Sequence, residues 1–241
     1  MDTDTSPYDC GSYASSTTYV TGMAVVRTCE VLRGKITRVG AQLLGAAPED
    51  VCFDGDCVRR MDSEESVPLR EIAQAHMTAG VEDLSACESN GSPISPPPFM
   101  AGCAEIDLDP FTGQVEVVDY VGVVDCGTVV NPNLARVQTE GGIMQGIGMA
   151  LTENPEMNGR GRTVSNSFLQ YKVPSRVDAR SVRVAFESSY EQTGPFGAKS
   201  IGECVINTPA PAIADAVYNA SGVRVRSLPI TAEKILLGER E

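Results

Sequence analysis

The sequence predicts an α+β fold, with mixed helices and antiparallel-rich sheets, for the whole chain 1–241. Two patterns carry this prediction. Apolar residues recur at helical spacing over 21–44, whereas apolar and acidic residues alternate over 103–108, as in a half-buried strand. No regular βαβ rhythm connects the elements. A hydrophobic content of 42% is sufficient for a core, and 1–98 and 99–241 are candidate sub-regions of one domain.

The N-terminal part predicts two helices and a hairpin. Residues 1–20 are rich in Ser, Thr, Tyr, Asp and Gly, which is typical of a terminal tail. A helix is expected over 21–44, a hairpin over 51–58 and a shorter helix over 68–77. The polar, proline-rich stretch 80–98 follows, and its composition fits either a linker or a loop.

The remainder of the chain predicts a mixture of strands and helices. Its clearest feature is a pair of strands joined by a turn at 109–113, where Asp-Pro and Gly are turn formers. The expected strands are 103–108, 114–124, 165–173 and 181–187, and the expected helices are 141–151, 208–220 and 231–237.

The helix expected over 141–151 has an unusual face. Gly142, Gly146 and Ala150 are spaced four residues apart and therefore form a stripe without large side chains. A glycine inside a helix costs about 1 kcal/mol relative to alanine. This cost indicates that something packs very close to the stripe, either another backbone or a cofactor.

Charge and cysteine usage exclude several classes of function. A net charge of −13 disfavours binding to nucleic acids or to anionic membranes, and it is typical of a soluble protein. There is no signal peptide and no apolar run long enough to cross a bilayer. Cys52 and Cys57 flank a turn and could form a disulfide, but the scattered cysteines favour reduced thiols in the cytoplasm. The single histidine, His76, has no evident metal partner in the sequence.

The run GPFGAKSIGE over 194–203 places one carboxylate, Glu203, on a glycine-rich loop before a helix. The glycines allow sharp bends or close approach to a ligand. A Glu that is held there and shielded from water has a raised pKa and acts as a general base. The alternative is a Glu that only favours the helix N-terminus. Thr208 is the expected cap of the helix that follows.

Four stretches in order resemble the large, molybdenum-binding subunit of the xanthine dehydrogenase family. They are the terminal run 2–18, the glycine-rich run 138–153, the loop 194–203, and the tail 222–231. Together they span nearly the whole chain. Within the third stretch, GAKSIGE is most similar to bacterial purine and nicotinate hydroxylases. The resemblance implies the C-terminal molybdopterin-binding half of such a subunit.

The resemblance also implies roles for seven residues. Glu203 matches the catalytic base of the family, and Gln138 matches a glutamine that forms a hydrogen bond near the cofactor. The segment that wraps the pterin and its phosphate is matched by Ala14, Ser15, Ser16, Thr17 and Thr18, with Ala14 nearest the metal. Without the resemblance, this Ser/Thr run is read as a simple N-cap segment.

The resemblance further implies an enzyme that hydroxylates an N-heterocycle of the purine, xanthine or nicotinate type, with water as the oxygen source. The expected cofactor is molybdopterin, with its cytosine dinucleotide form as one option. Iron–sulfur clusters and FAD are expected on partner chains, together with the N-terminal half of the molybdopterin subunit. The chain is then a naturally split subunit or a fragment. Alternatives are an aldehyde or carbon monoxide dehydrogenase-type subunit and a non-catalytic assembly subunit.

Overall fold

The computed structural model describes residues 4, 8, 11–78, 80–92, 94–175 and 177–238. The chain forms two compact units, a larger one of Met1–Tyr19 with Ile94–Glu241 and a smaller one of Val20–Pro93. Both contain helices and strands, so the prediction of an α+β fold is confirmed. The units differ from the candidate sub-regions 1–98 and 99–241, because the residues before Val20 join the larger unit.

The smaller unit contains two helices and a three-stranded antiparallel sheet, whose strands follow the first helix and precede the second along the chain. Helix α1 (Thr17–Leu43) precedes strands β1 (Val51–Phe53), β2 (Cys57–Arg60) and β3 (Ser66–Pro68), and helix α2 (Leu69–Thr78) follows. A short 3-10 turn, Pro48–Asp50, leads into β1. The helix expected over 21–44 and the hairpin over 51–58 are confirmed.

Apolar side chains from α1, the sheet and α2 form the core of this unit. Val39, Val58 and Ile72 are almost completely buried. Gly40 allows α1 to approach the sheet, because a Cβ at this position would lie 2.5 Å from Cβ of Val58. The smaller unit therefore has a hydrophobic core of its own.

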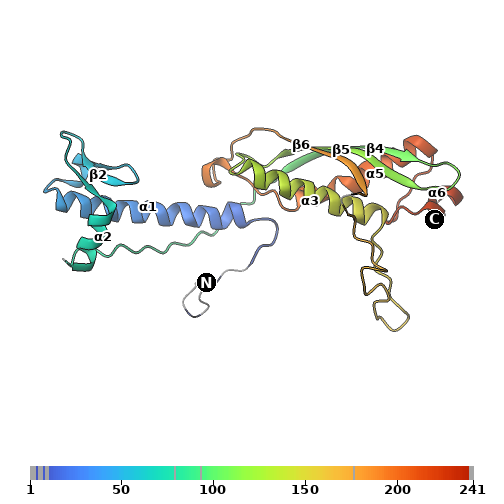
Figure 1. The fold of residues 1–241 in the computed structure, drawn as a ribbon, viewed down its shortest axis with the longest axis horizontal. Coiled ribbons are helices and arrows are strands. Elements are labelled where there is room, and N and C mark those ends of the chain that lie inside the picture. The colour runs from blue at the N-terminus through green and yellow to red at the C-terminus, as the bar shows by residue number, and fades with distance from the viewer. Residues whose placement is uncertain are drawn as a thin grey trace. The chain divides into compact units, whose positions relative to one another are not determined.

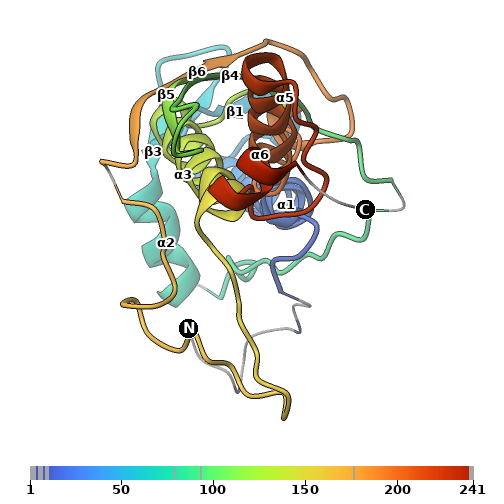
Figure 2. The ribbon, with the colours of Figure 1, turned by 90° about the vertical axis from the view of Figure 1, so that its right-hand side faces the viewer.

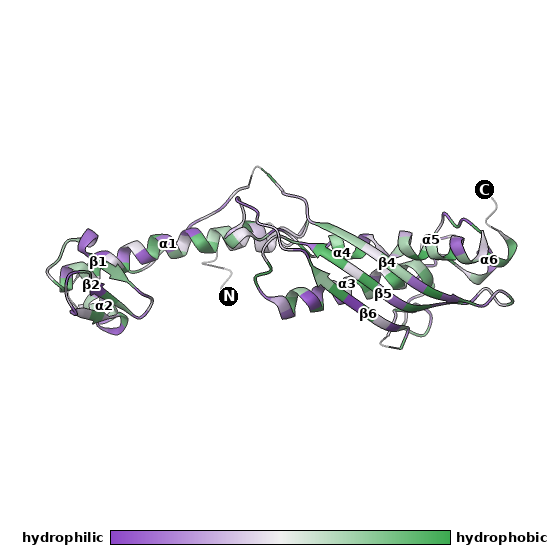
Figure 3. Ribbon diagram, turned by 90° about the horizontal axis from the view of Figure 1, so that it is seen from above, coloured by the Kyte–Doolittle hydropathy of each residue, from purple (hydrophilic) through white to green (hydrophobic). Residues whose placement is uncertain are grey.

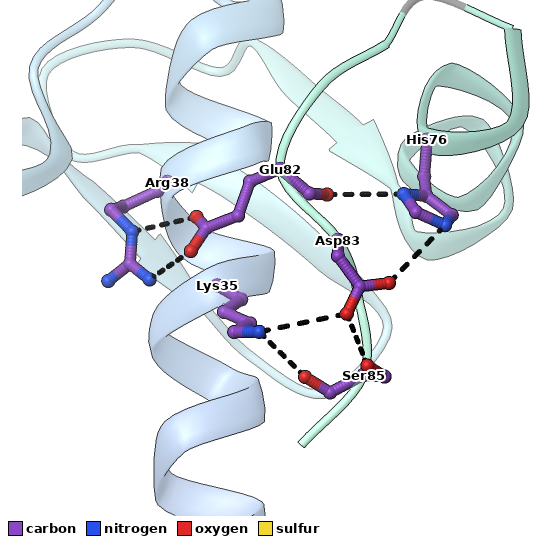
Figure 4. A network of polar contacts seen from close by, with 6 residues as sticks. All are labelled: Lys35, Arg38, His76, Glu82, Asp83 and Ser85. Carbon is purple, nitrogen blue, oxygen red and sulfur yellow. Dashed lines mark hydrogen bonds and ion pairs between the residues drawn. The ribbon is translucent and has the colours of Figure 1, made fainter.

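Polar side chains hold the segment after α2 against α1, as Figure 4 shows. Arg38 forms two hydrogen bonds with the Glu82 carboxylate, at 2.9 and 2.7 Å. The Nζ atom of Lys35 donates to the carbonyl of Ser85 at 2.7 Å. The Nδ1 atom of His76 lies 3.2 Å from the carbonyl oxygen of Glu82. This extended stretch therefore belongs to the smaller unit over most of its length.

The larger unit is built on a three-stranded sheet in the order β4–β5–β6. Strands β4 (Phe99–Leu108) and β5 (Val115–Asp125) pair antiparallel, as predicted. Strand β6 (Ala179–Phe186) pairs with β5 in parallel, after the chain passes through helix α3 (Pro132–Leu151). The sheet therefore contains one βαβ unit, β5–α3–β6, which the sequence did not predict.

Helices α3 and α5 (Pro209–Ser221) lie side by side against one face of this sheet (Figures 1 and 2). Hydrophobic and hydrophilic residues alternate along the strands (Figure 3), and in β4 every second residue is partly buried. The core between the layers includes the fully buried Tyr120, Ile143 and Ile213. Two shorter helices, α4 (Cys204–Asn207) and α6 (Ala232–Leu237), complete the unit.

The glycine stripe of α3 packs against protein. A Cβ on Gly142 would lie 2.2 Å from Val205, and one on Gly146 would lie 2.6 Å from Pro209. The helix begins at Pro132 and not at 141, because Asn131 accepts a hydrogen bond from the amide of Leu134 and forms the N-cap. Helices α4 and α5 therefore pack on the stripe, mainly through the side chains of Val205 and Pro209 and also through the Ile206 carbonyl.

One of the expected strands is not formed. The strand expected over 165–173 is absent from the described residues, because Gln170 and Tyr171 donate backbone hydrogen bonds to Ser167 and close a turn. Apolar side chains suggested a strand there, yet they are largely exposed. Cys52 and Cys57 are free thiols, as the sequence favoured, and the alternative of a disulfide between them is not formed. In the described part of the chain, no helix is long and apolar enough to cross a membrane.

Candidate functional site

A cavity of about 630 Å³ lies in the larger unit, at the end of the sheet where β5 stops. Four segments of this unit provide its wall: the run 12–18, the segment 126–131 after β5, the first turns of α3 and the loop 198–203. The run 12–18, the stretch from 126 through the first turns of α3, and the loop 198–203 are far apart in the sequence. The fold therefore brings the start, the middle and the end of the chain to one concave site.

Five of the seven predicted site residues line this cavity. Ser15, Thr17, Thr18, Gln138 and Glu203 are among its wall residues. Ala14 and Ser16 belong to the same run but do not line the cavity, and the Oγ atom of Ser16 donates to the carbonyl of Tyr13 at 2.9 Å. Of the resembling run at the N-terminus, only Asp4 and Tyr8 lie among the described residues before 11.

Ser15 and Glu203 contact each other directly. The Oγ atom of Ser15 donates a hydrogen bond to Oε2 of Glu203 at 3.2 Å, across 188 positions of sequence. The backbone at Ala14 and Ser15 is left-handed, with φ of 50° and 55°. A non-glycine residue adopts this conformation at a cost in free energy, and residues strained in this way are often found at functional sites. Gly202 leaves room for the contact, because a Cβ there would lie 2.9 Å from Ser15 Oγ.

Glu203 precedes α4 and makes no side-chain capping hydrogen bond to that helix. Glu203 is the N-cap residue of α4, where its charge can favour the helix N-terminus without a hydrogen bond. Its side chain is exposed, so the burial that the sequence analysis expected is not supplied by this chain. Thr208 does not cap α5 with its side chain either. Its Oγ1 atom instead accepts a hydrogen bond from the Tyr120 hydroxyl at 2.8 Å.

Glycines shape the loop that leads to Glu203. Gly197 has a φ of 86°, and a Cβ there would lie 2.4 Å from the Tyr190 ring. A Cβ on Gly194 would lie 2.0 Å from the carbonyl oxygen of Ala198. The loop is therefore folded tightly on itself, and only glycine fits at these two positions.

A buried ion pair, which the sequence analysis missed, lies at the cavity wall. Nζ of Lys199 lies 2.7 Å from Oδ2 of Asp125, and the Lys199 side chain is 9% exposed. Burial acts to raise the pKa of Asp125, but hydrogen bonds from Lys199, Ser189 and the amide of Gly127 outweigh it and lower that pKa. The sequence signal was weak, because the two residues are 74 positions apart.

Two thiols near the cavity are not nucleophiles at neutral pH. Burial raises the pKa of Cys126, which lines the cavity, and raises that of Cys204 to about 11. Only the thiolate form of cysteine attacks or binds metals. Among the described residues that line the cavity, Glu203 is the one carboxylate.

The cavity suits an anionic ligand that accepts hydrogen bonds. Helices α1 and α3 both begin at its wall, at Thr17 and Pro132. Amide N–H groups in the first turn of a helix lack partners within the helix and favour negative charge. Hydroxyl groups of Thr18 and Thr128 add further donors. This set of donors fits a phosphate-bearing pterin cofactor.

The chain matches the molybdopterin cofactor-binding domain family over residues 1–180. It is 36% identical to the probable hypoxanthine oxidase XdhD of Escherichia coli K12, over 98% of this chain and 25% of that protein. It is 32% identical to the xanthine dehydrogenase molybdenum-binding subunit of Escherichia coli O157:H7, over 98% of this chain and 32% of that protein.

Among solved structures, quinoline 2-oxidoreductase from Pseudomonas putida 86 superimposes with a TM-score of 0.87 at 25% identity. The match covers 98% of this chain and 31% of that one. The chain therefore spans about a quarter to a third of the length of these relatives.

Proposed function

Because this chain belongs to the molybdopterin cofactor-binding domain family, we propose that it forms part of a molybdenum hydroxylase that oxidises an N-heterocycle. One observation carries the proposal. Ser15, Gln138 and Glu203 come from three of the four stretches that resemble the xanthine dehydrogenase family, and all three line one cavity. Residues so distant in sequence meet at one site because of the fold.

Molybdopterin is the proposed ligand of this cavity. The Thr18 hydroxyl would hold the phosphate of the pterin, and Gln138 would donate a hydrogen bond from α3. Ser15 and Thr17, whose hydroxyls donate to Glu203 and to Ser12, would line the same wall of the pocket. Ala14 would contribute through the left-handed backbone at Ala14 and Ser15, and Ser16 through its hydrogen bond to the Tyr13 carbonyl beside that turn. When bound, the molybdenum cofactor supplies the two-electron redox chemistry of the hydroxylation.

Glu203 is the proposed general base. Its carboxylate would accept a proton from the water-derived oxygen nucleophile as that oxygen attacks the substrate carbon. Among the described residues, the Glu203 side chain has one hydrogen-bond partner, Ser15, which bonds Oε2. The Ser15 hydroxyl fixes one oxygen of the carboxylate and leaves Oε1 to receive the proton. The same hydrogen bond orients Glu203 toward the cavity.

The proposal extends to partners and cellular location. An acceptor for the electrons is required, and iron–sulfur and FAD subunits are the proposed acceptors. The N-terminal half of a molybdopterin subunit would close the cavity over Glu203, which is exposed in this chain. The cytosine dinucleotide form of the cofactor and the cytoplasmic location remain predictions.

The names of the relatives reported above favour an N-heterocycle as the substrate. Hypoxanthine, xanthine and quinoline, which those names contain, are all N-heterocycles. An aldehyde or carbon monoxide dehydrogenase-type activity is the second candidate. A non-catalytic assembly role is the third, and the direct contact between Ser15 and Glu203 argues against it.

Turnover in isotopically labelled water tests this function. The assembled enzyme, with its molybdenum content measured, is incubated in H₂¹⁸O with hypoxanthine, nicotinate, quinoline or benzaldehyde. We expect at least one heterocycle to be hydroxylated with the label in the product. Oxidation of benzaldehyde alone would contradict the heterocycle assignment, and a molybdenum-loaded complex that turns over none of the four would contradict the proposal.

A further inference from the structure

The Asp125–Lys199 ion pair joins two segments that both line the cavity. Asp125 is the last residue of β5, and Lys199 stands four positions before Glu203. Side chains of the pair are 22% and 9% exposed, respectively. Nζ of Lys199 also lies 5.3 Å from the centre of the Phe99 ring, which allows a cation–π contact.

Asp125 has its hydrogen-bonding capacity well satisfied. Its Oδ1 atom accepts from Ser189 Oγ at 2.5 Å and from the Gly127 amide at 3.0 Å, while Oδ2 accepts from Lys199. These contacts join the end of β5, the segment after β6 and the loop 194–203. A partly buried carboxylate that accepts hydrogen bonds from three donors is held in one orientation. Its oxygens are occupied, so it is not available as a second base.

The backbone of the same two segments is also paired. The amide of Lys199 donates to the Cys126 carbonyl at 2.7 Å, and the amide of Thr128 donates to the Gly197 carbonyl at 2.8 Å. A Cβ on Gly127 would lie 2.3 Å from the Gly197 oxygen, which shows how closely the segments approach. The ion pair and the backbone hydrogen bonds therefore attach the same short part of the loop, Gly197 to Lys199, to the end of β5.

We propose that the Asp125–Lys199 ion pair is a positioning device that holds the loop 194–203 on the end of β5 and so directs Glu203 into the cavity. This inference rests on the proposed function of Glu203. Lys199 is the only basic side chain among the described residues that line the cavity, but its charge is engaged by Asp125. It therefore acts through the loop, and not as an anion ligand.

The energetics of buried ion pairs support a positioning role over a stabilising one. Removing water from both charges offsets much of their attraction, so an apolar pair of similar volume is often as stable. Removing one partner alone leaves the other charge buried without compensation. A pair at this position is therefore better explained by the single geometry it imposes on the loop.

Amide hydrogen exchange of the assembled enzyme tests the anchoring directly. Lys199→Met and Asp125→Asn should each accelerate exchange in the peptides covering 194–203 and 126–128 by about tenfold or more, because local opening becomes easier. Lys199→Arg, which keeps the charge and the donors, should restore slow exchange. Unchanged exchange in both neutralising variants would overturn the proposal.

Kinetics then test whether the anchor acts through Glu203. We expect Lys199→Met to lower kcat by about tenfold to hundredfold with a much smaller change in KM, since a small misplacement of a reacting group has an effect of this size. In a Glu203→Gln background the same substitution should have little further effect, because residues that act as a unit are not additive.

Matched controls separate the two hypotheses. Lys234→Met removes a lysine that donates to the carbonyls of Ser227 and Pro229 in the same unit but away from the cavity, and it should leave kcat unchanged. If Glu203→Gln abolishes turnover while Lys199→Met does not slow it, only the positioning role fails. If Glu203→Gln turns over at the normal rate, the proposed base fails and the inference fails with it.

Discussion

One ion pair in each unit of the chain shows how differently charged side chains can be placed. In the smaller unit, Arg38 and Glu82 pair at the surface, with side chains 51% and 37% exposed. In the larger unit, Lys199 and Asp125 pair at 9% and 22% exposure beside the cavity. Surface pairs contribute little to stability, whereas a buried pair restricts geometry. The comparison indicates that charge is buried where a loop must be held in one place.

The predicted site residues all lie in one of the two units. Each unit has a hydrophobic core, centred on Ile72 in the smaller unit and on Ile143 and Ile213 in the larger one. All seven residues implied by the family resemblance fall in the larger unit. The cavity is formed by loops and helix ends rather than by the core, so stability and chemistry can be perturbed separately.

The largest expected effect on stability comes from emptying either core. Ile213→Ala and Ile72→Ala remove fully buried side chains, and each should lower the free energy of unfolding of its own unit by about 2–5 kcal/mol. Urea titration followed by limited proteolysis would identify the unit that opens. Only Ile213→Ala should also lower the molybdenum content. An equal loss of molybdenum in Ile72→Ala would contradict the separation of the two units.

A pair of glycines in α3 gives the next largest effect, and the two should change stability in opposite directions. A Cβ on Gly146 would lie 3.0 Å from the Ile206 carbonyl and closer still to Pro209, whereas nothing lies within 4 Å of one on Gly141. Gly146→Ala should therefore destabilise the larger unit by about 1–3 kcal/mol.

Gly141→Ala is the matched control on the same helix. It should stabilise the unit by about 0.5–1 kcal/mol, because alanine favours the helix and meets no neighbour. Thermal unfolding of both variants measures the difference. Equal stability changes would show that the glycine stripe does not serve the packing of α3 against α4 and α5.

The smallest effect is expected at the surface of the smaller unit. Arg38→Met removes two hydrogen bonds to Glu82, yet the free energy of unfolding should change by less than about 1 kcal/mol, because the pair is exposed. The same measurement in high salt should show little difference between variant and parent. A loss of several kcal/mol would remove the contrast with the Asp125–Lys199 pair.

Local sequence patterns were sufficient for most elements of the fold. Helical periodicity predicted α1, turn residues predicted the β1–β2 hairpin, and alternation along β4 with the turn at 109–113 predicted the β4–β5 pair. The glycine stripe predicted close packing but not the neighbour, since Val205 and Pro209 lie some 60 positions away. The stretch 165–173 misled because its apolar residues, Phe168 and Leu169 among them, are exposed.

The candidate site could be predicted only where a contiguous run carried the signal. Glu203 and Ser15 stand in such runs, and the fold brings them within hydrogen-bonding distance. The Asp125–Lys199 pair could not be predicted, because it depends on the parallel pairing of β5 with β6 and on the return of the loop 194–203 to the end of β5. Such long-range contacts are set by tertiary structure rather than by local sequence.

Glu203→Gln in the assembled enzyme tests the central claim most directly. The rate at which substrate reduces the bound cofactor is measured at a saturating concentration of hypoxanthine, or of the heterocycle that is turned over fastest. Molybdenum content is determined on the same sample. Glutamine keeps the shape of the side chain but cannot accept the proton, so the rate should fall by about 10²–10⁴-fold at unchanged molybdenum content. Glu233→Gln, an exposed position on α6 outside the cavity, should keep the full rate. A Glu203→Gln enzyme that retains most of the rate would contradict the account.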